Sequence, residues 1–127
     1  MIEKIVKTLT LTSIMATLYF TSASAETFEG TIQGADCVIN DAYCAEDRTD
    51  PHLCMEKNFI LVTEGKEYFF LPNLYRSLKE SCYKQNVRVT GKRSGKAIRV
   101  DTLDVQKAGE YRRIWDRKKF EEDLYDR

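Results

Sequence analysis

Apolar and polar residues follow one another along the chain in a way that predicts a mainly β protein. Some segments alternate the two kinds, as strands with one buried face do, and others are short apolar runs, as in fully buried strands. We expect five strands, over residues 27–33, 58–63, 67–71, 86–91 and 97–105. Residues 64–66, Glu-Gly-Lys, suit a hairpin turn between the second and third. In the last strand the apolar positions change parity at residues 101–102, which predicts a β-bulge.

A helix is expected between the third and fourth strands. Leu74, Leu78 and Cys82 recur every four residues, so they would share one face of a helix over residues 74–85. Asn73 precedes this segment, and asparagine commonly caps the first turn of a helix. We therefore expect a helix that begins after Asn73 and packs on the sheet through one apolar face.

The C-terminal segment, residues 108–127, is mostly charged and carries the single tryptophan, Trp115. Phe120 and Leu124 project to one side of a helical wheel, whereas four other side chains project near the opposite side: Tyr111, Ile114, Trp115 and Tyr125. We expect a helix here. Two roles stay open for it, because it can pack on the sheet through Trp115 or bind a partner.

The N-terminal residues have the order of a secretory signal peptide. Lys4 and Lys7 precede an uncharged, largely apolar stretch, and the small residues Ala23 and Ala25 occupy the usual cleavage positions. The apolar stretch is too short and too rich in threonine for a membrane span. We therefore expect cleavage of residues 1–25, a periplasmic or secreted protein, and no membrane span after cleavage.

The balance of charges argues against nucleic acid as a partner. The chain has 20 basic and 20 acidic residues. Cleavage would remove Lys4, Lys7 and Glu3, which leaves a net charge of about −1 when His52 is counted as neutral. Nucleic-acid binding depends on clustered positive charge that neutralises phosphates. The same balance gives no reason to expect anionic lipid.

All four cysteines, Cys37, Cys44, Cys54 and Cys82, lie beyond the signal peptide. An even number of cysteines in a small exported domain is most simply paired in disulfides. Three pairings are possible, and we favour Cys37 with Cys44, which closes a short loop, and Cys54 with Cys82. Three of the cysteines fall in residues 34–56, whose turn-forming residues predict a long ordered loop.

A metal or haem site built from His52 and cysteines is the alternative use of these residues. The cysteine gaps of six and nine residues differ from the ligand spacing usual in zinc sites, and no Cys-x-x-Cys motif is present. The sequence thus indicates neither a metal nor a cofactor.

The order of the expected elements resembles that of the OB-fold, a five-stranded barrel with a helix between its third and fourth strands. The run from Asn86 to Gly91 has a Val-x-Val-x-Gly pattern and, with the strand after it, looks like the closing hairpin of exported bacterial OB-fold domains. The resemblance implies an OB-like barrel over residues 26–106, followed by a charged helix or tail over residues 107–127.

OB-folds commonly bind ligands on strands two and three, beside the loops that join strands one to two and four to five. For this chain the resemblance implies the following candidate binding residues: Tyr68, Phe70, His52, Lys92, Arg93 and Lys96. Trp115 joins them if the tail binds a partner. Each also has a structural alternative, because aromatic residues pack in sheets, cations are common in solvated turns, and the ring of His52 follows a proline in a turn.

Motifs for catalysis are absent from the sequence, which has a single histidine and no nucleophile elbow, zinc-protease motif or phosphate loop. We expect a protein without enzymatic activity. The leading hypothesis is an exported binding or accessory module that acts on an envelope protein or a small ligand through its barrel face or its tail. A metal or haem carrier using His52 is the second hypothesis, and an oligosaccharide or nucleic-acid binder is the third.

Overall fold

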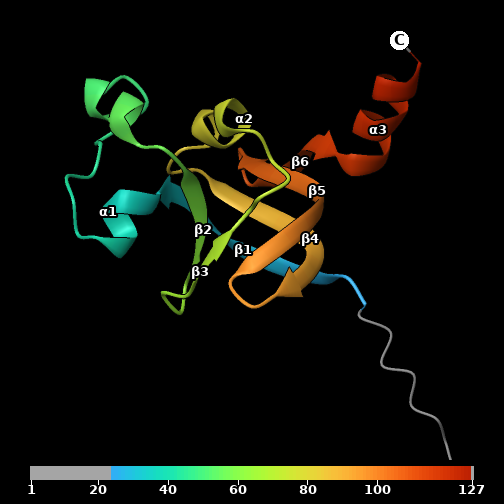
Figure 1. Cartoon of the computed structure of the whole chain (residues 1–127), viewed down its shortest axis with the longest axis horizontal. Coiled ribbons are helices and arrows are strands. Elements are labelled where there is room, and N and C mark those ends of the chain that lie inside the picture. Colours follow the sequence, from blue (N-terminus) through green and yellow to red (C-terminus); the bar gives the residue numbers. More distant parts are fainter. Residues whose placement is uncertain (1–23, 127) are drawn as a thin grey trace, which may run out of the picture.

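The computed structural model describes residues 24–126, which form a six-stranded sheet and several short helices (Figure 1). The sheet order is β3-β2-β1-β4-β5-β6, and neighbours in this order are antiparallel. The strands are β1 (Glu26–Gly34), β2 (Phe59–Thr63), β3 (Tyr68–Phe70), β4 (Asn86–Ser94), β5 (Ala97–Lys107) and β6 (Glu110–Asp116). The predicted signal peptide, residues 1–25, lies outside the described residues except for its last two positions.

A further pairing closes part of this sheet into a ring. β3 also pairs in parallel with β5, through Phe70 and Ala97, and the N–H of Phe70 donates to the carbonyl of Lys96 at 2.7 Å. Strands β1 to β5 therefore form a ring, and β6 extends the sheet beyond it at β5. The mainly β fold and its five expected strands are confirmed, whereas the OB-like barrel stays a prediction.

Side chains that face the inside of the ring form the apolar core. Val87 and Val89 of β4 are fully buried, as the sequence predicts, while Arg88 between them faces outward. Burial of each large apolar side chain contributes roughly 1.5–3 kcal/mol relative to exposure. Every strand contributes to this core, including Ile32, Phe59, Leu61, Phe69, Ile98, Val100, Leu103, Val105 and Trp115.

β5 stays in contact with the core across a change of register. Thr90 of β4 pairs with Thr102, but Gly91 pairs with Val100, so Asp101 is the extra residue of a β-bulge. The bulge predicted at residues 101–102 is confirmed. Because of it, buried positions on the two sides of Asp101 differ in parity and still face the same core.

The helix between β3 and β4 is shorter than predicted. α2 (Arg76–Ser81) begins after Tyr75, so the predicted cap at Asn73 is wrong. The Asn73 side chain instead donates to the carbonyl of Val100 and accepts from its N–H, both at 2.8 Å. Asn73 thus ties the segment before α2 to β5, and its amide oxygen is not available to cap a helix.

The C-terminal segment is not a single helix. It forms β6 and then α3 (Arg117–Tyr125), so the helix predicted for residues 108–127 is wrong over its first half. Ala108 and Gly109 both have positive φ and close a two-residue hairpin loop between β5 and β6. Trp115 of β6 faces the core of the ring.

A bulge in β6 breaks the alternation by which a strand is recognised in a sequence. Successive residues of β5 pair with Trp115 and Arg113, so Ile114 between them is the extra residue. Residues four positions apart share a face in a regular strand, but the bulge turns Trp115 toward the core while Tyr111 faces away from it.

The loop predicted for residues 34–56 contains two short helices, α1 (Ala35–Ile39) and the 3-10 helix η1 (Pro51–Met55). Polar contacts hold it on the sheet, among them a hydrogen bond of 2.6 Å from the buried Tyr83 hydroxyl to the carbonyl of Ala45. The segment is therefore an ordered part of the fold. No helix in the described part of the chain is long and apolar enough to span a bilayer.

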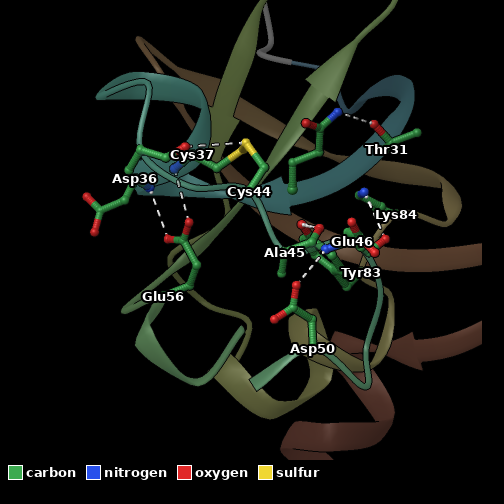
Figure 2. Close-up of a disulfide and its surroundings, with 12 residues drawn as sticks. Thr31, Asp36, Cys37, Cys44, Ala45, Glu46, Asp50, Glu56, Tyr83 and Lys84 are labelled. Atoms are coloured by element: carbon green, nitrogen blue, oxygen red, sulfur yellow. Dashed lines mark hydrogen bonds between the residues drawn. A yellow bond between two sulfur atoms is a disulfide. The ribbon is translucent and has the colours of Figure 1, made fainter. Parts of the chain in front are cut away.

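Cys37 and Cys44 form a disulfide that closes the segment after β1 (Figure 2). This predicted bridge is confirmed. Cys54 and Cys82 are both free thiols, so the second predicted bridge is wrong. The sequence argument required Cys54 to turn inward from an irregular loop, but η1 buries Leu53 and leaves Cys54 exposed, while Cys82 is buried at the end of α2.

Candidate functional site

A trough of about 650 Å³ lies on the outer face of the sheet. It crosses five neighbouring strands, from β2 through β1, β4 and β5 to β6, and includes the turn between β2 and β3. Uncharged polar side chains make up much of its lining: Thr31, Gln33, Thr63, Asn86, Gln106 and Tyr111.

The register of the strands explains why these side chains lie together. Thr31 of β1 pairs with Val62 of β2 on one side and with Asn86 of β4 on the other. Gln106 of β5 pairs with Tyr111 of β6. Residues that pair directly point to the same face of a sheet, and the Asn86 side chain donates to that of Gln106 at 3.3 Å. The result is one continuous row of side chains across five strands.

Tyr111, at one end of this row, is positioned by a charged cluster beside it. The Arg88 guanidinium lies 4.4 Å from the centre of the Tyr111 ring. Arg88 and Arg113 share the carboxylate of Asp104, each at an N–O distance of 3.1 Å. Asp104 is only 4% exposed, so the two arginines compensate its buried charge. The cluster thereby fixes an aromatic ring against the trough.

Acidic and basic side chains both line the trough, and two of the strands beneath it, β1 and β2, approach each other closely. Glu29 and Glu64 line it together with Lys66. A Cβ atom on Gly30 would lie 2.1 Å from the carbonyl oxygen of Val62, so only glycine lets β1 approach β2 this closely beside the trough.

Three of the residues implied by the OB-fold resemblance do lie together, on another part of the surface. Tyr68 and Phe70 of β3 are half-buried, and their ring centres are 6.1 Å apart. Lys96 places its Nζ 4.7 Å from the centre of the Tyr68 ring. Lys96 therefore packs on the Tyr68 ring, as Arg88 does on that of Tyr111.

The other two predicted cations belong to a strand. β4 continues to Ser94, so Lys92 and Arg93 are not in the predicted turn, which is shortened to residues 95–96. Arg93 lies over the ring of Phe69 with its guanidinium carbon 5.1 Å from the ring centre. Lys92 is exposed and pairs in register with Arg99.

His52 lies in η1 and does not line the trough. Its Nδ1 is 2.8 Å from Oδ1 of Asp50, and the Tyr43 ring packs on it with a centre-to-centre distance of 4.2 Å. These aromatic residues and Met55 line a separate pocket of about 240 Å³. Hydrogen bonds from the N–H groups of His52 and Glu46, and from the His52 ring, lower the pKa of Asp50 to about 2. Within residues 24–126, no three His, Cys, Asp or Glu side chains cluster to hold a metal ion.

Trp115 is part of the core and is only 8% exposed. Its ring packs against that of Phe120 in α3, with centres 5.9 Å apart. The indole Nε1 is buried, and it has no hydrogen-bond acceptor among the residues that the structure describes.

Sequence reasoning missed the trough because it depends on register. Thr31, Asn86 and Gln106 are outward polar residues of separate strands, and nothing in their spacing shows that they align. Tyr111 was expected in a helix, where it could not extend the row. The one available signal was the short hairpin between β4 and β5, which places the outward residues of those two strands side by side.

Comparison with known proteins identifies no relative. No protein family matches the chain, and neither a curated protein nor a solved structure matches it significantly. Its function is therefore inferred from its own residues.

Proposed function

We propose that this chain is an exported, non-catalytic binding module of the cell envelope, periplasmic or secreted, that holds a neutral oligosaccharide in the trough across its sheet. The carrying observation is the row in which Thr31, Asn86, Gln106 and Tyr111 align over neighbouring strands. The OB-like barrel predicted from the sequence is the scaffold in this proposal, and the predicted signal peptide is its route of export.

The chemistry of the lining favours a ligand rich in hydroxyl groups. Side-chain amides and hydroxyls both donate and accept hydrogen bonds, and so do the hydroxyls of a sugar. In the trough, Gln33 already donates to Thr31 at 3.0 Å, which shows that these side chains lie within bonding reach of one another. A ligand that presents alternating donors and acceptors can bond to the whole row.

The charges of the trough disfavour the competing ligand classes. A polyanion needs a surface with a clear positive excess, whereas the lining holds two glutamates, Glu29 and Glu64, and a single lysine, Lys66. A strongly apolar ligand would cover the polar groups of the row and leave them without hydrogen-bond partners, which costs free energy. A neutral, polar ligand avoids both costs.

Tyr111 supplies the aromatic surface that such a site needs. Sugars present C–H groups on one face of the ring, and tyrosine combines an apolar ring with a polar hydroxyl. Arg88 holds the Tyr111 ring at a fixed place, so little side-chain entropy is lost when a ligand packs against it.

The test is a calorimetric titration of the purified protein with two neutral tetrasaccharides, chitotetraose and cellotetraose. At least one should bind, and Tyr111→Ala should weaken its binding about fivefold, because loss of an aromatic contact costs on the order of 1 kcal/mol. Tyr68→Ala removes a half-buried tyrosine outside the trough and is the matched control, with unchanged affinity expected.

Circular dichroism of each variant verifies that the sheet is intact before affinities are compared. The proposal is overturned if neither tetrasaccharide binds, or if Tyr68→Ala weakens binding as much as Tyr111→Ala does. A heparin oligosaccharide that binds more tightly than both neutral probes would also contradict it, since the lining has no positive excess.

A further inference from the structure

The segment between β1 and β2 concentrates negative charge. Residues 35–56 contain six acidic residues and one basic residue, so their net charge is −5 when His52 is counted as neutral. The rest of residues 26–127 has 17 basic and 13 acidic residues, a net charge of +4. A surface with such an excess of one sign attracts partners of the other. The acidic residues of the segment are Asp36, Asp41, Glu46, Asp47, Asp50 and Glu56.

The cations around this segment do not pair with its carboxylates. Arg48, its single basic residue, donates to the carbonyl of Ser81 at 2.8 Å. Arg76 and Lys84, from outside the segment, donate to its backbone carbonyls. Within residues 24–126, no lysine or arginine forms an ion pair with any of the six carboxylates. Their charge is therefore available to a cationic partner.

The pocket of about 240 Å³ beside His52 lies on this acidic segment. Two of the six carboxylates, those of Asp36 and Glu56, line it, and the described lining includes no lysine or arginine. Tyr43 and Met55 also line the pocket and are 59% and 75% exposed. The pocket thus combines negative charge with aromatic and apolar surface.

Contacts within the segment hold the pocket in shape. The Tyr43 and His52 rings pack on each other, and Asp50 accepts from the Tyr43 hydroxyl at 3.4 Å and contacts the ring of His52. Glu56 is held by N–H groups at the start of α1, the helix that carries Asp36 (Figure 2). Side chains that are already ordered lose less entropy when a ligand binds.

The size and chemistry of the pocket favour the side chain of an arginine. Cavities that enclose a small-molecule ligand measure roughly 300–1,000 Å³, so this smaller pocket suits a single side chain. The planar guanidinium group of arginine stacks on aromatic rings and pairs with carboxylates, whereas the ammonium group of lysine is a compact, strongly hydrated charge. The carboxylates outside the pocket suit further basic residues of the same partner.

We propose that this pocket receives an arginine side chain from a basic segment of another protein. The guanidinium group lies on the ring of Tyr43 and donates to the carboxylate of Asp36, while Met55 covers the apolar stem of the arginine. The other carboxylates of residues 35–56 attract the flanking cations of the partner. The pocket and the trough have no lining residue in common, so this is a second binding surface.

The test is a fluorescence anisotropy titration with a fluorescein-labelled peptide, Gly-Lys-Gly-Arg-Gly-Lys-Gly, and two versions that differ at the central residue. Citrulline keeps the shape of arginine without its charge, and lysine keeps the charge without the planar group. The arginine peptide should bind saturably. The citrulline peptide should bind about tenfold more weakly, because it loses a charge-assisted hydrogen bond, and the lysine peptide about threefold more weakly, because it stacks less well.

Two pairs of protein variants separate the pocket from the general charge of the segment. Asp36→Asn removes a lining carboxylate and should weaken binding of the arginine peptide about tenfold. Asp41→Asn removes the same charge from an exposed residue outside the pocket and should weaken it less than about twofold. Tyr43→Ala should weaken binding about threefold, whereas Tyr125→Ala, an exposed tyrosine of α3, should leave it unchanged. Circular dichroism verifies that each variant is folded.

The proposal is overturned if the arginine peptide does not bind, if either altered peptide binds equally well, or if Asp41→Asn weakens binding as much as Asp36→Asn does. Sedimentation of the protein alone should show a monomer. A dimer that Tyr43→Ala dissociates would contradict the proposal, because a second copy would then occupy the pocket. Tyr43→Ala should leave tetrasaccharide binding unchanged, since Tyr43 does not line the trough. The peptide and the oligosaccharide experiments can therefore fail independently.

Discussion

Asp50 organises the segment between α1 and β2. It caps η1 by accepting from the N–H of His52 at 2.9 Å, and its second oxygen accepts from the N–H of Glu46 at 3.1 Å. Tyr43 also directs its hydroxyl toward this carboxylate, which raises the pKa of that tyrosine. The N–H groups and the hydroxyl all donate to this carboxylate and so favour its ionised form, which couples the local structure to pH.

The low pKa of Asp50 predicts a specific loss of stability in acid. Its pKa is lowered to about 2 in the folded chain, from about 3.9 in an unfolded one. The ionised form therefore stabilises the fold fully above about pH 4, and this contribution is lost as pH falls towards about 2. Asp50→Asn should be less stable than the unmodified protein at pH 7, and the difference should shrink between pH 4 and pH 2.

Urea unfolding at pH 7, 4, 3 and 2 measures this difference. The comparison with Asp50→Asn isolates one carboxylate, because all other acidic groups are common to both proteins. A stability difference that stays constant from pH 7 to pH 2 would show that the Asp50 charge makes no contribution to the fold.

At the scale of elements, α1 depends on an acceptor from outside its own sequence. Gly34, its N-cap residue, has no side chain, and the helix is capped instead by Glu56 (Figure 2). The buried Glu56 carboxylate accepts from the N–H groups of Asp36 and Cys37, both at 3.0 Å. This contact joins the start of α1 to Glu56 and so holds together the two ends of the segment over residues 36–56.

Gly34→Ala should displace this cap. A Cβ atom there would lie 2.2 Å from Oε1 of Glu56, so the carboxylate must move and two N–H groups lose their acceptor. Loss of a helix cap costs about 1 kcal/mol, and chemical denaturation should show a decrease of this size. Gly65→Ala is the control. Nothing lies within 4 Å of a Cβ atom added there, so the stability of this variant should differ little from that of the unmodified protein.

A double-mutant cycle identifies the cause. Gly34→Ala should cost much less in a Glu56→Ala background, because the cap is already gone there. An equal cost in both backgrounds would mean that backbone strain, and not loss of the Glu56 contact, destabilises the variant.

The strands of the ring were predictable, because their alternation is set by one buried face. The C-terminal strand was not, because the bulge at Ile114 interrupts its alternation, and the pairing of Arg113 with Asp104 is visible only once β5 and β6 are aligned. The cap on α1 could not be predicted from the sequence for a related reason. Glu56 lies 20 residues from Asp36, and no local pattern connects a glycine at a helix start with a distant carboxylate.

The candidate sites follow the same rule at the scale of the whole molecule. The resemblance to the OB-fold implied the surface of Tyr68 and Lys96, and those residues do lie together, but the trough requires the register of five strands from separate parts of the chain. β6, the strand outside the ring, contributes Tyr111 to the trough.

The most direct test of the oligosaccharide proposal is a map of backbone amide shifts. Nitrogen-15 spectra of the purified protein are recorded during titration with whichever neutral tetrasaccharide binds in calorimetry, chitotetraose or cellotetraose. We expect saturable shift changes at Thr31, Asn86, Gln106 and Tyr111, which lie on four strands and share one row. Changes confined to the surface around Tyr68, or no saturable changes at millimolar ligand, would contradict the assignment of the trough as the binding site.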